Sequence, residues 1–206
     1  MNKDPVRIAV LVSGGGTNLQ AILDAQTKGV LSSGRVKTVI ADRPGAYALR
    51  RAEQAGIITH TVAKKQYTSQ EAFENALLTL LKQEKTELIV LAGFLSVLSR
   101  RFTDAYPKRI LNVHPSLIPS FCGDGFYGLR VHEAALARGV KVTGATVHFV
   151  NEITDGGEII IQKAVRVLPG DTPEKLQRRV MKQAEWIILP KAAEMVCRSI
   201  QGGNKV

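Results

Sequence analysis

An amide, an imidazole and a carboxylate in this sequence could together move protons and stabilise a negatively charged oxygen. Asn112 and His114 lie two positions apart in the apolar segment 110–114, and Asp155 precedes two glycines further along the chain. Residues two apart on a strand point to the same face of a sheet. Asn112 could then donate a hydrogen bond to an oxyanion, and Asp155 could favour a protonated His114.

Each of these side chains also has a purely structural explanation. His114 is equally well explained as a buried histidine bonded to the backbone, Asn112 as a turn-capping amide, and Asp155 as an ordinary turn residue. Ser116 lies near His114, but no GxSxG pattern surrounds it, so we expect a turn-stabilising hydroxyl rather than a nucleophile. Structural roles are also expected for the other histidines, His60, His132 and His148.

A glycine-rich segment near the start of the chain could bind an anion. Residues 13–18 read Ser-Gly-Gly-Gly-Thr-Asn and connect a predicted strand to a predicted helix. Backbone N–H groups and the positive end of a helix dipole converge at such a junction. The dinucleotide pattern GxGxxG fails at Leu19 and the triphosphate pattern GxxxxGK[ST] also fails, which favours a single phosphate. The alternative is a turn that only allows close packing of strand and helix.

The elements that must position these residues alternate between apolar and amphipathic segments, which is typical of βαβ units with a parallel sheet. Two later strands flank the turn at Asp155 and predict an antiparallel or mixed edge. Pro115 ends the strand that carries His114, and ligands of such sheets bind at that edge. Predicted strands cover residues 6–12, 36–41, 57–62, 88–92, 110–113, 142–150 and 159–167, and predicted helices cover residues 18–28, 46–55, 69–84 and 131–138.

A last helix has a clear predicted start. Thr172 is its expected N-cap, Pro173 its first residue, and Glu174 complements the helix dipole. Pro190 is expected to bend this helix. Its apolar stripe consists of Leu176, Val180, Ala184, Ile187 and Ile188.

The composition restricts the domain organisation and the partners. With 206 residues, the chain is expected to form one domain or two tightly fused halves. Its 28 Lys and Arg against 18 Asp and Glu give a net charge of +10, which favours anionic partners. Because the basic residues are scattered and aromatic residues make up only 5%, a small anionic molecule is a better candidate than nucleic acid.

Cysteine usage and the absence of long apolar runs predict the cellular location. Cys122 and Cys197 lie far apart, and no CxxC or HExxH pattern is present, so we expect two free thiols and no metal. No apolar run reaches the length of a membrane span, and the first residues do not resemble a signal peptide. The expected location is the cytoplasm, without membrane attachment.

Three motifs in this order resemble those of the phosphoribosylglycinamide formyltransferase family: residues 13–18, the run Asn-Val-His-Pro-Ser-Leu-Ile-Pro at 112–119, and Asp-Gly-Gly at 155–157. The resemblance covers nearly the whole chain. It implies a Rossmann-like, open twisted and mainly parallel α/β sheet with helices on both faces. It also implies formyl transfer from N10-formyltetrahydrofolate to the amine of glycinamide ribonucleotide, in de novo purine biosynthesis.

The same resemblance implies the organisation of the chain. Residues 1–206 would form a single formyltransferase domain, with a phosphoribosyl-binding half at 1–108 and a catalytic and folate-binding half at 109–206. The partners would be the two small-molecule substrates, with no metal and no nucleic acid, and the protein would be a monomer or weak homodimer.

Roles for individual residues follow from the matching motifs. The catalytic residues would be Asn112, His114 and Asp155. The ribonucleotide would be bound by Gly16, Thr17, Asn18, Lys182, Gln183, Ala184 and Glu185. The folate would be bound by Gln70, Leu95, Ser96, Val97, Leu98, Asn151, Glu152, Ile153 and Thr154.

The chain departs from the family pattern at a few positions. Ser96 and Gln70 stand where many members have arginine, which leaves open how the glutamate tail of the folate is held. The segment 121–128 is longer than is common, and its role is open.

Two alternative functions share part of these features. The HPSLxP run also occurs in methionyl-tRNA formyltransferase and formyltetrahydrofolate deformylase, and the extra domains of both relatives are not expected here. Deformylase chemistry, in which water replaces the amine, is one alternative. A non-catalytic module for phosphorylated ligands or RNA is another, but it leaves the grouping of Asn112, His114 and Asp155 unexplained.

Overall fold

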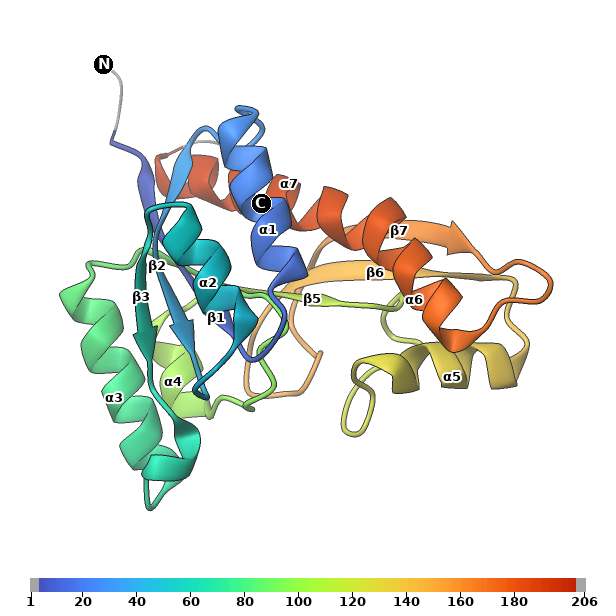
Figure 1. Cartoon of the computed structure of the whole chain (residues 1–206), viewed down its shortest axis with the longest axis horizontal. Coiled ribbons are helices and arrows are strands. Elements are labelled where there is room, and N and C mark those ends of the chain that lie inside the picture. Colours follow the sequence, from blue (N-terminus) through green and yellow to red (C-terminus); the bar gives the residue numbers. More distant parts are fainter. Residues whose placement is uncertain (1–3, 203–206) are drawn as a thin grey trace.

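The computed structural model describes residues 4–202, which contain one seven-stranded sheet (Figure 1). Its strands are β1 Val6–Val12, β2 Gly34–Ala41, β3 Ile58–Thr61, β4 Leu88–Leu91, β5 Ile110–His114, β6 Val142–Phe149 and β7 Ile159–Arg166. Across the sheet they follow the order β3-β2-β1-β4-β5-β6-β7. β1 to β5 pair in parallel, whereas β6 pairs antiparallel with β5 and β7. The predicted mainly parallel sheet with a mixed C-terminal edge is confirmed.

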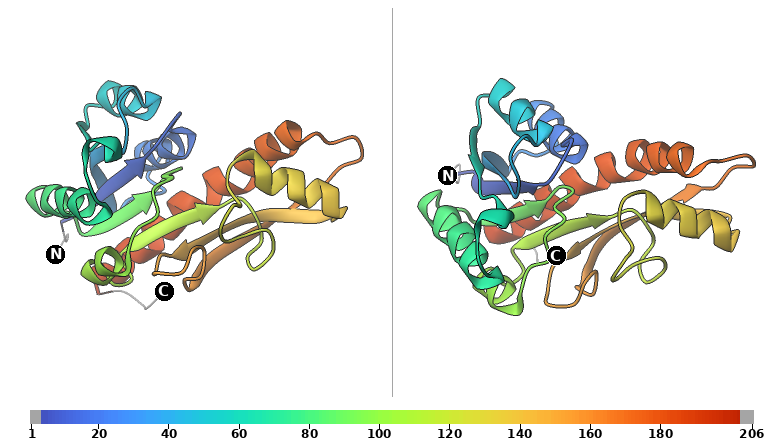
Figure 2. Two further views of the ribbon diagram at one scale, coloured as in Figure 1. Left: turned by 90° about the horizontal axis from the view of Figure 1, so that it is seen from below. Right: turned by 60° about the horizontal axis from the view of Figure 1, so that its bottom comes forward.

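Helices cover both faces of the sheet (Figure 2). They are α1 Thr17–Thr27, α2 Tyr47–Gln54, α3 Gln70–Gln83, α4 Arg100–Ala105, α5 Leu129–Arg138, α6 Pro173–Val180 and α7 Trp186–Ile200. Neighbouring residues of β1 explain the two layers, because they point to opposite faces. Ile8 and Val10 pack in the core shared with α1, α2 and α7, whereas Ala9 and Leu11 pack in the core shared with α3 and α4.

Two of the helices begin at the residues that the sequence indicates. Ser69 Oγ accepts a hydrogen bond from the N–H of Ala72 at the start of α3. Thr172 Oγ1 accepts one from Lys175 at the start of α6, whose first residue is Pro173. The short helix α4 was not predicted, because six residues are too few to show an apolar period.

The last predicted helix is divided by a π-helical turn, η2, at Met181–Glu185. This departure from regular α-helix lies before Pro190, which is inside α7. Ala184 and Glu185, at the end of this turn, are both buried. Of the predicted stripe, Leu176, Val180, Ala184 and Ile188 are buried, and Ile187 is half-buried.

The carboxyl ends of the parallel strands β1, β4 and β5 meet at one edge of the sheet. The glycine-rich segment follows β1, residues 92–99 follow β4, and Pro115 follows β5. This edge is where an open α/β sheet binds its ligands. Within residues 4–202, no helix has the length and apolar character needed to cross a membrane.

Candidate active site

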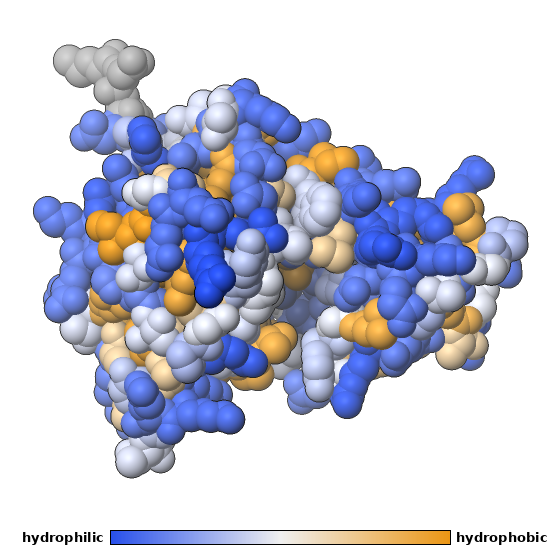
Figure 3. Space-filling view, in the orientation of Figure 1, coloured by the Kyte–Doolittle hydropathy of each residue, from blue (hydrophilic) through white to orange (hydrophobic). Residues whose placement is uncertain are grey.

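A cavity of about 700 Å³ opens at this edge of the sheet. Its lining includes Asn18 after β1, Leu95 after β4, and Asn112 and His114 at the end of β5. Asp155, from the turn between β6 and β7, also lines it. Figure 3 shows the surface hollowed between the part that carries β1 to β4 and the part that carries β6, β7 and α5.

The amide, imidazole and carboxylate that the sequence singled out are in contact. His114 Nδ1 lies 3.2 Å from Asp155 Oδ2, and Asn112 Nδ2 lies 3.5 Å from Asp155 Oδ1. The side chains of His114 and Asp155 are only 5% and 8% exposed, so their charges interact with little screening by water. The expectation that Asn112 and His114 share one face of a strand is confirmed.

Both ring nitrogens of His114 lie next to hydrogen-bond acceptors. In addition to the contact with Asp155, Nε2 lies 2.8 Å from the carbonyl oxygen of Phe121. A protonated ring donates to both acceptors, whereas a neutral ring donates to only one. Burial nevertheless lowers the pKa of His114 below its ordinary value, against the opposing effects of Asp155 and the Phe121 carbonyl. Asp155 acts in the predicted direction, but the ring is mainly neutral at pH 7.

The carboxylate of Asp155 is held in its ionised form. Burial alone would raise the pKa of Asp155, but the hydrogen bond with His148, the charge of His114 and the N–H of Gly123 outweigh it. The Gly123 N–H donates to Oδ2 at 3.0 Å. The pKa of Asp155 therefore lies below its ordinary value, and the group is a carboxylate whenever His114 gains or loses a proton near neutral pH.

His148 also belongs to this cluster, although the sequence interpretation gives it a structural role. It lies directly opposite Asn112 in the pairing of β5 with β6. Its Nε2 lies 3.2 Å from Asn112 Nδ2 and 3.6 Å from Asp155 Oδ1, and its Nδ1 lies 2.8 Å from the carbonyl oxygen of Phe149. His148 therefore contacts both the amide and the carboxylate of the cluster. Only the register of β5 against β6, which the sequence does not reveal, could have identified it.

The glycine-rich segment forms a tight loop between β1 and α1. Gly16 has a φ of 72°, and a Cβ at this position would lie 2.6 Å from the Cβ of Ala48. Only glycine fits there, for conformational and for steric reasons. Gly14 and Gly15 have open space where a side chain would be, so an anion can approach their backbone closely. Both explanations offered by the sequence, close packing and anion binding, therefore have a structural basis.

Glu185 reaches the same region from the π-helical turn. Its Oε2 accepts a hydrogen bond from Asn18 Nδ2 at 2.8 Å, and both residues line the cavity. Burial raises the pKa of Glu185 to about 7, although the bond from Asn18 acts in the opposite direction. Glu185 is therefore a buried carboxyl that is neutral below neutral pH and charged above it.

This raised pKa predicts a pH-dependent cost in stability. In the unfolded chain the carboxyl ionises near its ordinary value, so the folded protein loses stability as pH rises from that value to about 7. We expect the free energy of unfolding of the Glu185→Gln variant to be about 2–3 kcal/mol higher than that of the wild type at pH 8. At pH 5 we expect little difference between the two proteins. Urea unfolding at both pH values tests this, and an equal difference at both would contradict the assignment.

Two loops carry most of the residues that the resemblance assigns to folate. The first loop lines the cavity with Leu95, Ser96, Val97 and Leu98. The second loop, residues 151–154 before Asp155, also lines it. Leu95, Val97 and Ile153 are 55%, 63% and 62% exposed, which is unusual for apolar side chains and leaves them available to a flat apolar ligand.

The two positions that depart from the family pattern have internal partners. Ser96 Oγ donates to Asp42 Oδ2 at 2.8 Å. Gln70 Nε2 donates to the carbonyl oxygen of Val97 at 2.8 Å and to Glu74 at 2.7 Å. Both hydrogen bonds therefore fix the loop 95–98: Ser96 belongs to this loop, and Gln70 contacts it from α3.

Several of the predicted ligand contacts lie outside the cavity lining, namely Gly16, Thr17, Gln70, Lys182, Gln183 and Ala184. Ala184 is fully buried in the core, so its side chain is not available to a ligand. Lys182 and Gln183 are exposed on the same turn as Glu185.

The segment 121–128, whose role the sequence left open, contributes Gly123 to Gly128 to the cavity wall. It is attached to the turn of Asp155 at two points. Gly123 donates to Asp155, and Thr154 Oγ1 donates to Asp124 Oδ1 at 2.9 Å. The segment thus supports the carboxylate as well as covering the cavity.

The serine and cysteine side chains that the sequence raised as candidates have no catalytic arrangement around them in the described part of the chain. Ser116 Oγ donates to the carbonyl oxygen of Ser120, which fits the turn-stabilising role expected for it. Cys122 and Cys197 are free thiols. In the described part of the chain, no group of three or more His, Cys, Asp or Glu side chains is arranged to hold a metal ion.

Comparison with known proteins identifies relatives that match most of this chain. Residues 6–192 match the formyl transferase family. The chain is 40% identical over 182 residues to phosphoribosylglycinamide formyltransferase of Escherichia coli (strain K12), which covers 88% of this chain and 83% of that protein. It is 45% identical over 191 residues to the trifunctional purine biosynthetic protein adenosine-3 of Gallus gallus, which covers 93% of this chain. The chain spans 18% of the length of that trifunctional protein.

Solved structures show the same fold. Glycinamide ribonucleotide transformylase 1 from Symbiobacterium toebii superimposes with a TM-score of 0.89 at 43% identity, covering 97% of this chain and 92% of that one. Phosphoribosylglycinamide formyltransferase from Brucella melitensis gives a TM-score of 0.86 at 39% identity, covering 98% and 99% of the two chains. The likeness thus extends over both halves of the sheet.

Proposed function

This chain belongs to the formyl transferase family, and we propose that it transfers the formyl group of N10-formyltetrahydrofolate to the amine of glycinamide ribonucleotide in purine biosynthesis. The products are formylglycinamide ribonucleotide and tetrahydrofolate. The observation that carries this proposal is the convergence of Asn112, His114 and Asp155 in a cavity that also contains the Asn18–Glu185 pair.

The ribonucleotide binds at the end of the cavity formed by α1 and the π-helical turn. The N–H groups of Gly16, Thr17 and Asn18 receive its phosphate, because the first N–H groups of a helix have no partner within the helix. Glu185 accepts hydrogen bonds from the ribose hydroxyls. Lys182 and Gln183 lie next to it and contribute at the rim.

The folate binds between the loop 95–98 and the loop 151–154. Their exposed apolar side chains pack against the pterin ring, and their backbone groups bond its polar edge. Because Ser96 and Gln70 are engaged with internal partners, they shape this pocket and leave the glutamate tail to other groups. The half 1–108 provides residues 16–18 for the ribonucleotide and 95–98 for the folate. The half 109–206 provides residues 182–185 for the ribonucleotide and 151–154 for the folate, so each half of the single domain contributes to both substrates.

The reaction begins when the neutral amine attacks the formyl carbon. A new C–N bond forms, and the electron pair of the carbonyl moves to oxygen, which becomes an oxyanion. Asn112 donates its amide N–H to this oxygen. Asp155 is kept away from the oxyanion by its bonds with His114 and Gly123.

The proton then moves from the attacking nitrogen to N10. His114, mainly neutral near pH 7, accepts this proton on Nε2, which exchanges the Phe121 carbonyl for the substrate, while Nδ1–H stays bonded to Asp155 and stabilises the imidazolium. It passes the proton to N10, directly or through water, as the bond between N10 and the formyl carbon breaks. The carbonyl re-forms on the product, and His114 is neutral again.

We propose that the protein is a monomer or weak homodimer. The free thiols Cys122 and Cys197 suit a reducing compartment, and we propose the cytoplasm as the location.

A steady-state assay with both substrates, each omitted in turn, tests this function. We expect formylglycinamide ribonucleotide and tetrahydrofolate to form together, and neither to form when one substrate is missing. Turnover of the folate without the ribonucleotide would assign deformylase chemistry instead. Binding of both ligands without product would reduce the protein to a binding module.

A further inference from the structure

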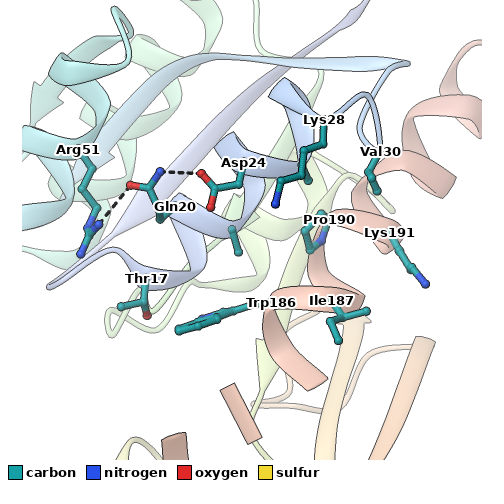
Figure 4. A pocket seen from close by; sticks show the side chains of 12 residues that line it. Thr17, Gln20, Asp24, Lys28, Val30, Arg51, Trp186, Ile187, Pro190 and Lys191 are labelled. Carbon is teal, nitrogen blue, oxygen red and sulfur yellow. Dashed lines mark hydrogen bonds between the residues drawn. The ribbon is translucent and has the colours of Figure 1, made fainter. Parts of the chain in front are cut away.

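Arg51 of α2 contacts the glycine loop from outside the active-site cavity. Its Nε–H donates to the carbonyl oxygen of Gly15 at 2.8 Å, and Nη1 donates to Gln20 Oε1 at 3.1 Å. The guanidinium also lies 5.0 Å from the centre of the Tyr47 ring. Figure 4 shows Arg51 at the end of a groove between α1 and α7, joined to Gln20, which is joined in turn to Asp24. The guanidinium is thus fixed on three sides.

Helix α2 holds two consecutive carbonyl groups of the loop. Besides the bond from Arg51 to Gly15, the N–H of Ala48 donates to the carbonyl oxygen of Gly14 at 3.0 Å. In a trans peptide the carbonyl and the following N–H point in opposite directions. The N–H groups of Gly15 and Gly16 therefore point away from α2, and the carbonyl of Gly16 bonds to Gln20 in the first turn of α1.

This orientation is what an anion requires of a loop. A carbonyl oxygen that turned toward the anion would repel it, and a loop containing three glycines can rotate its peptides easily. The bond from Arg51 opposes that rotation at Gly15. The same side chain also adds a full positive charge beside the loop, which a neutral donor would not.

We propose that Arg51 is a positioning residue for the phosphate of the substrate, which keeps the peptide groups of the glycine loop turned toward it and adds to its electrostatic attraction. This inference rests on the proposed function, because that function identifies the phosphate as part of the ribonucleotide. The contrasting explanation is that Arg51 only attaches α2 to α1.

The two explanations differ in what the Arg51→Met variant loses. Methionine keeps most of the apolar stem next to Gly16 but removes the donor and the charge. We expect KM for the ribonucleotide to rise about tenfold, as for the loss of one hydrogen bond from a charged group, with kcat and KM for the folate unchanged. The inhibition constant of ribose 5-phosphate rises equally, whereas that of glycinamide riboside, which has no phosphate, does not change.

Two further variants complete the experiment. Arg50→Met removes an equal charge from an exposed neighbour on the same helix, and we expect it to leave all these constants unchanged. Arg51→Lys keeps the charge and one donor, and we expect it to recover most of the affinity. If Arg51→Met is unstable by thermal melting, Arg51→Gln, which removes the charge but keeps a neutral donor, decides by the same ratio of phosphorylated to unphosphorylated inhibitor.

The inference is overturned if Arg51→Met keeps the wild-type affinity for ribose 5-phosphate, if it weakens the riboside equally, or if Arg50→Met has the same effect. Titration of ribose 5-phosphate into the protein measures this affinity without turnover. If the wild type binds ribose 5-phosphate but forms no formyl product, the proposed function is contradicted. The role of Arg51 in phosphate binding is then still decided by the titrations of the variants.

Discussion

Replacing His114 with alanine is expected to lower kcat by about 10²–10⁴-fold, with little change in KM for the ribonucleotide. The reason is that the imidazole carries the proton from the attacking nitrogen to N10 and lies at the end of β5, within reach of Asp155, rather than in the glycine loop. The loss should therefore appear in the chemical step and not in substrate binding. Single-turnover measurements with saturating ribonucleotide separate the two.

A matched control is available for this variant. His60 lies on β3 and contacts Glu84, outside the cavity lining, so His60→Ala removes a histidine without touching the site. We expect near-normal turnover from that control. Because His114 is buried, the alanine variant should also be compared with the wild type by circular dichroism and thermal melting. Near-normal turnover in a folded His114→Ala protein would refute the proton-transfer role.

Replacing Asn112 with alanine is expected to lower kcat by about 10²–10³-fold, the usual loss for one oxyanion donor. Asn112→Asp should be at least as damaging, because it removes the donor and places a second negative charge beside Asp155. Both variants should keep their KM values, since the amide contacts the reacting oxygen only after attack has begun. The measurement is kcat and KM for both substrates.

Asn75 provides the control for the asparagine variants. It is exposed on α3 and accepts a hydrogen bond from Arg101, so Asn75→Ala should not change turnover. If Asn112→Ala instead raised KM and left kcat unchanged, the amide would be a ground-state binding group. The developing negative charge would then need another donor.

The sequence predicted the seven strands because their apolar runs are interrupted by clear turn and helix signals. It also predicted that Asn112 and His114 share a face, since that depends only on the two-residue period of a strand. The contact of both with Asp155 needed the resemblance, because residues that are distant in sequence have no local signal of proximity. The π-helical turn that carries Glu185 has no recognisable sequence signature either.

Other features depend on strand register and on helix packing. His148 reaches Asn112 only because of how β6 pairs with β5. Arg51 reaches Gly15 only because α2 packs against the loop so closely that residue 16 must be glycine. The net effect on the pKa of His114 was also beyond the sequence, because the burial that lowers it depends on the packing of the whole cavity.

The fate of an isotopically labelled formyl carbon tests the central claim most directly. The labelled N10-formyltetrahydrofolate is mixed with the protein and glycinamide ribonucleotide, and the products are followed by nuclear magnetic resonance. We expect the label to appear in the formamide of the ribonucleotide in step with the release of tetrahydrofolate. Label released as formate at a rate that does not depend on the ribonucleotide would contradict direct transfer by Asn112, His114 and Asp155.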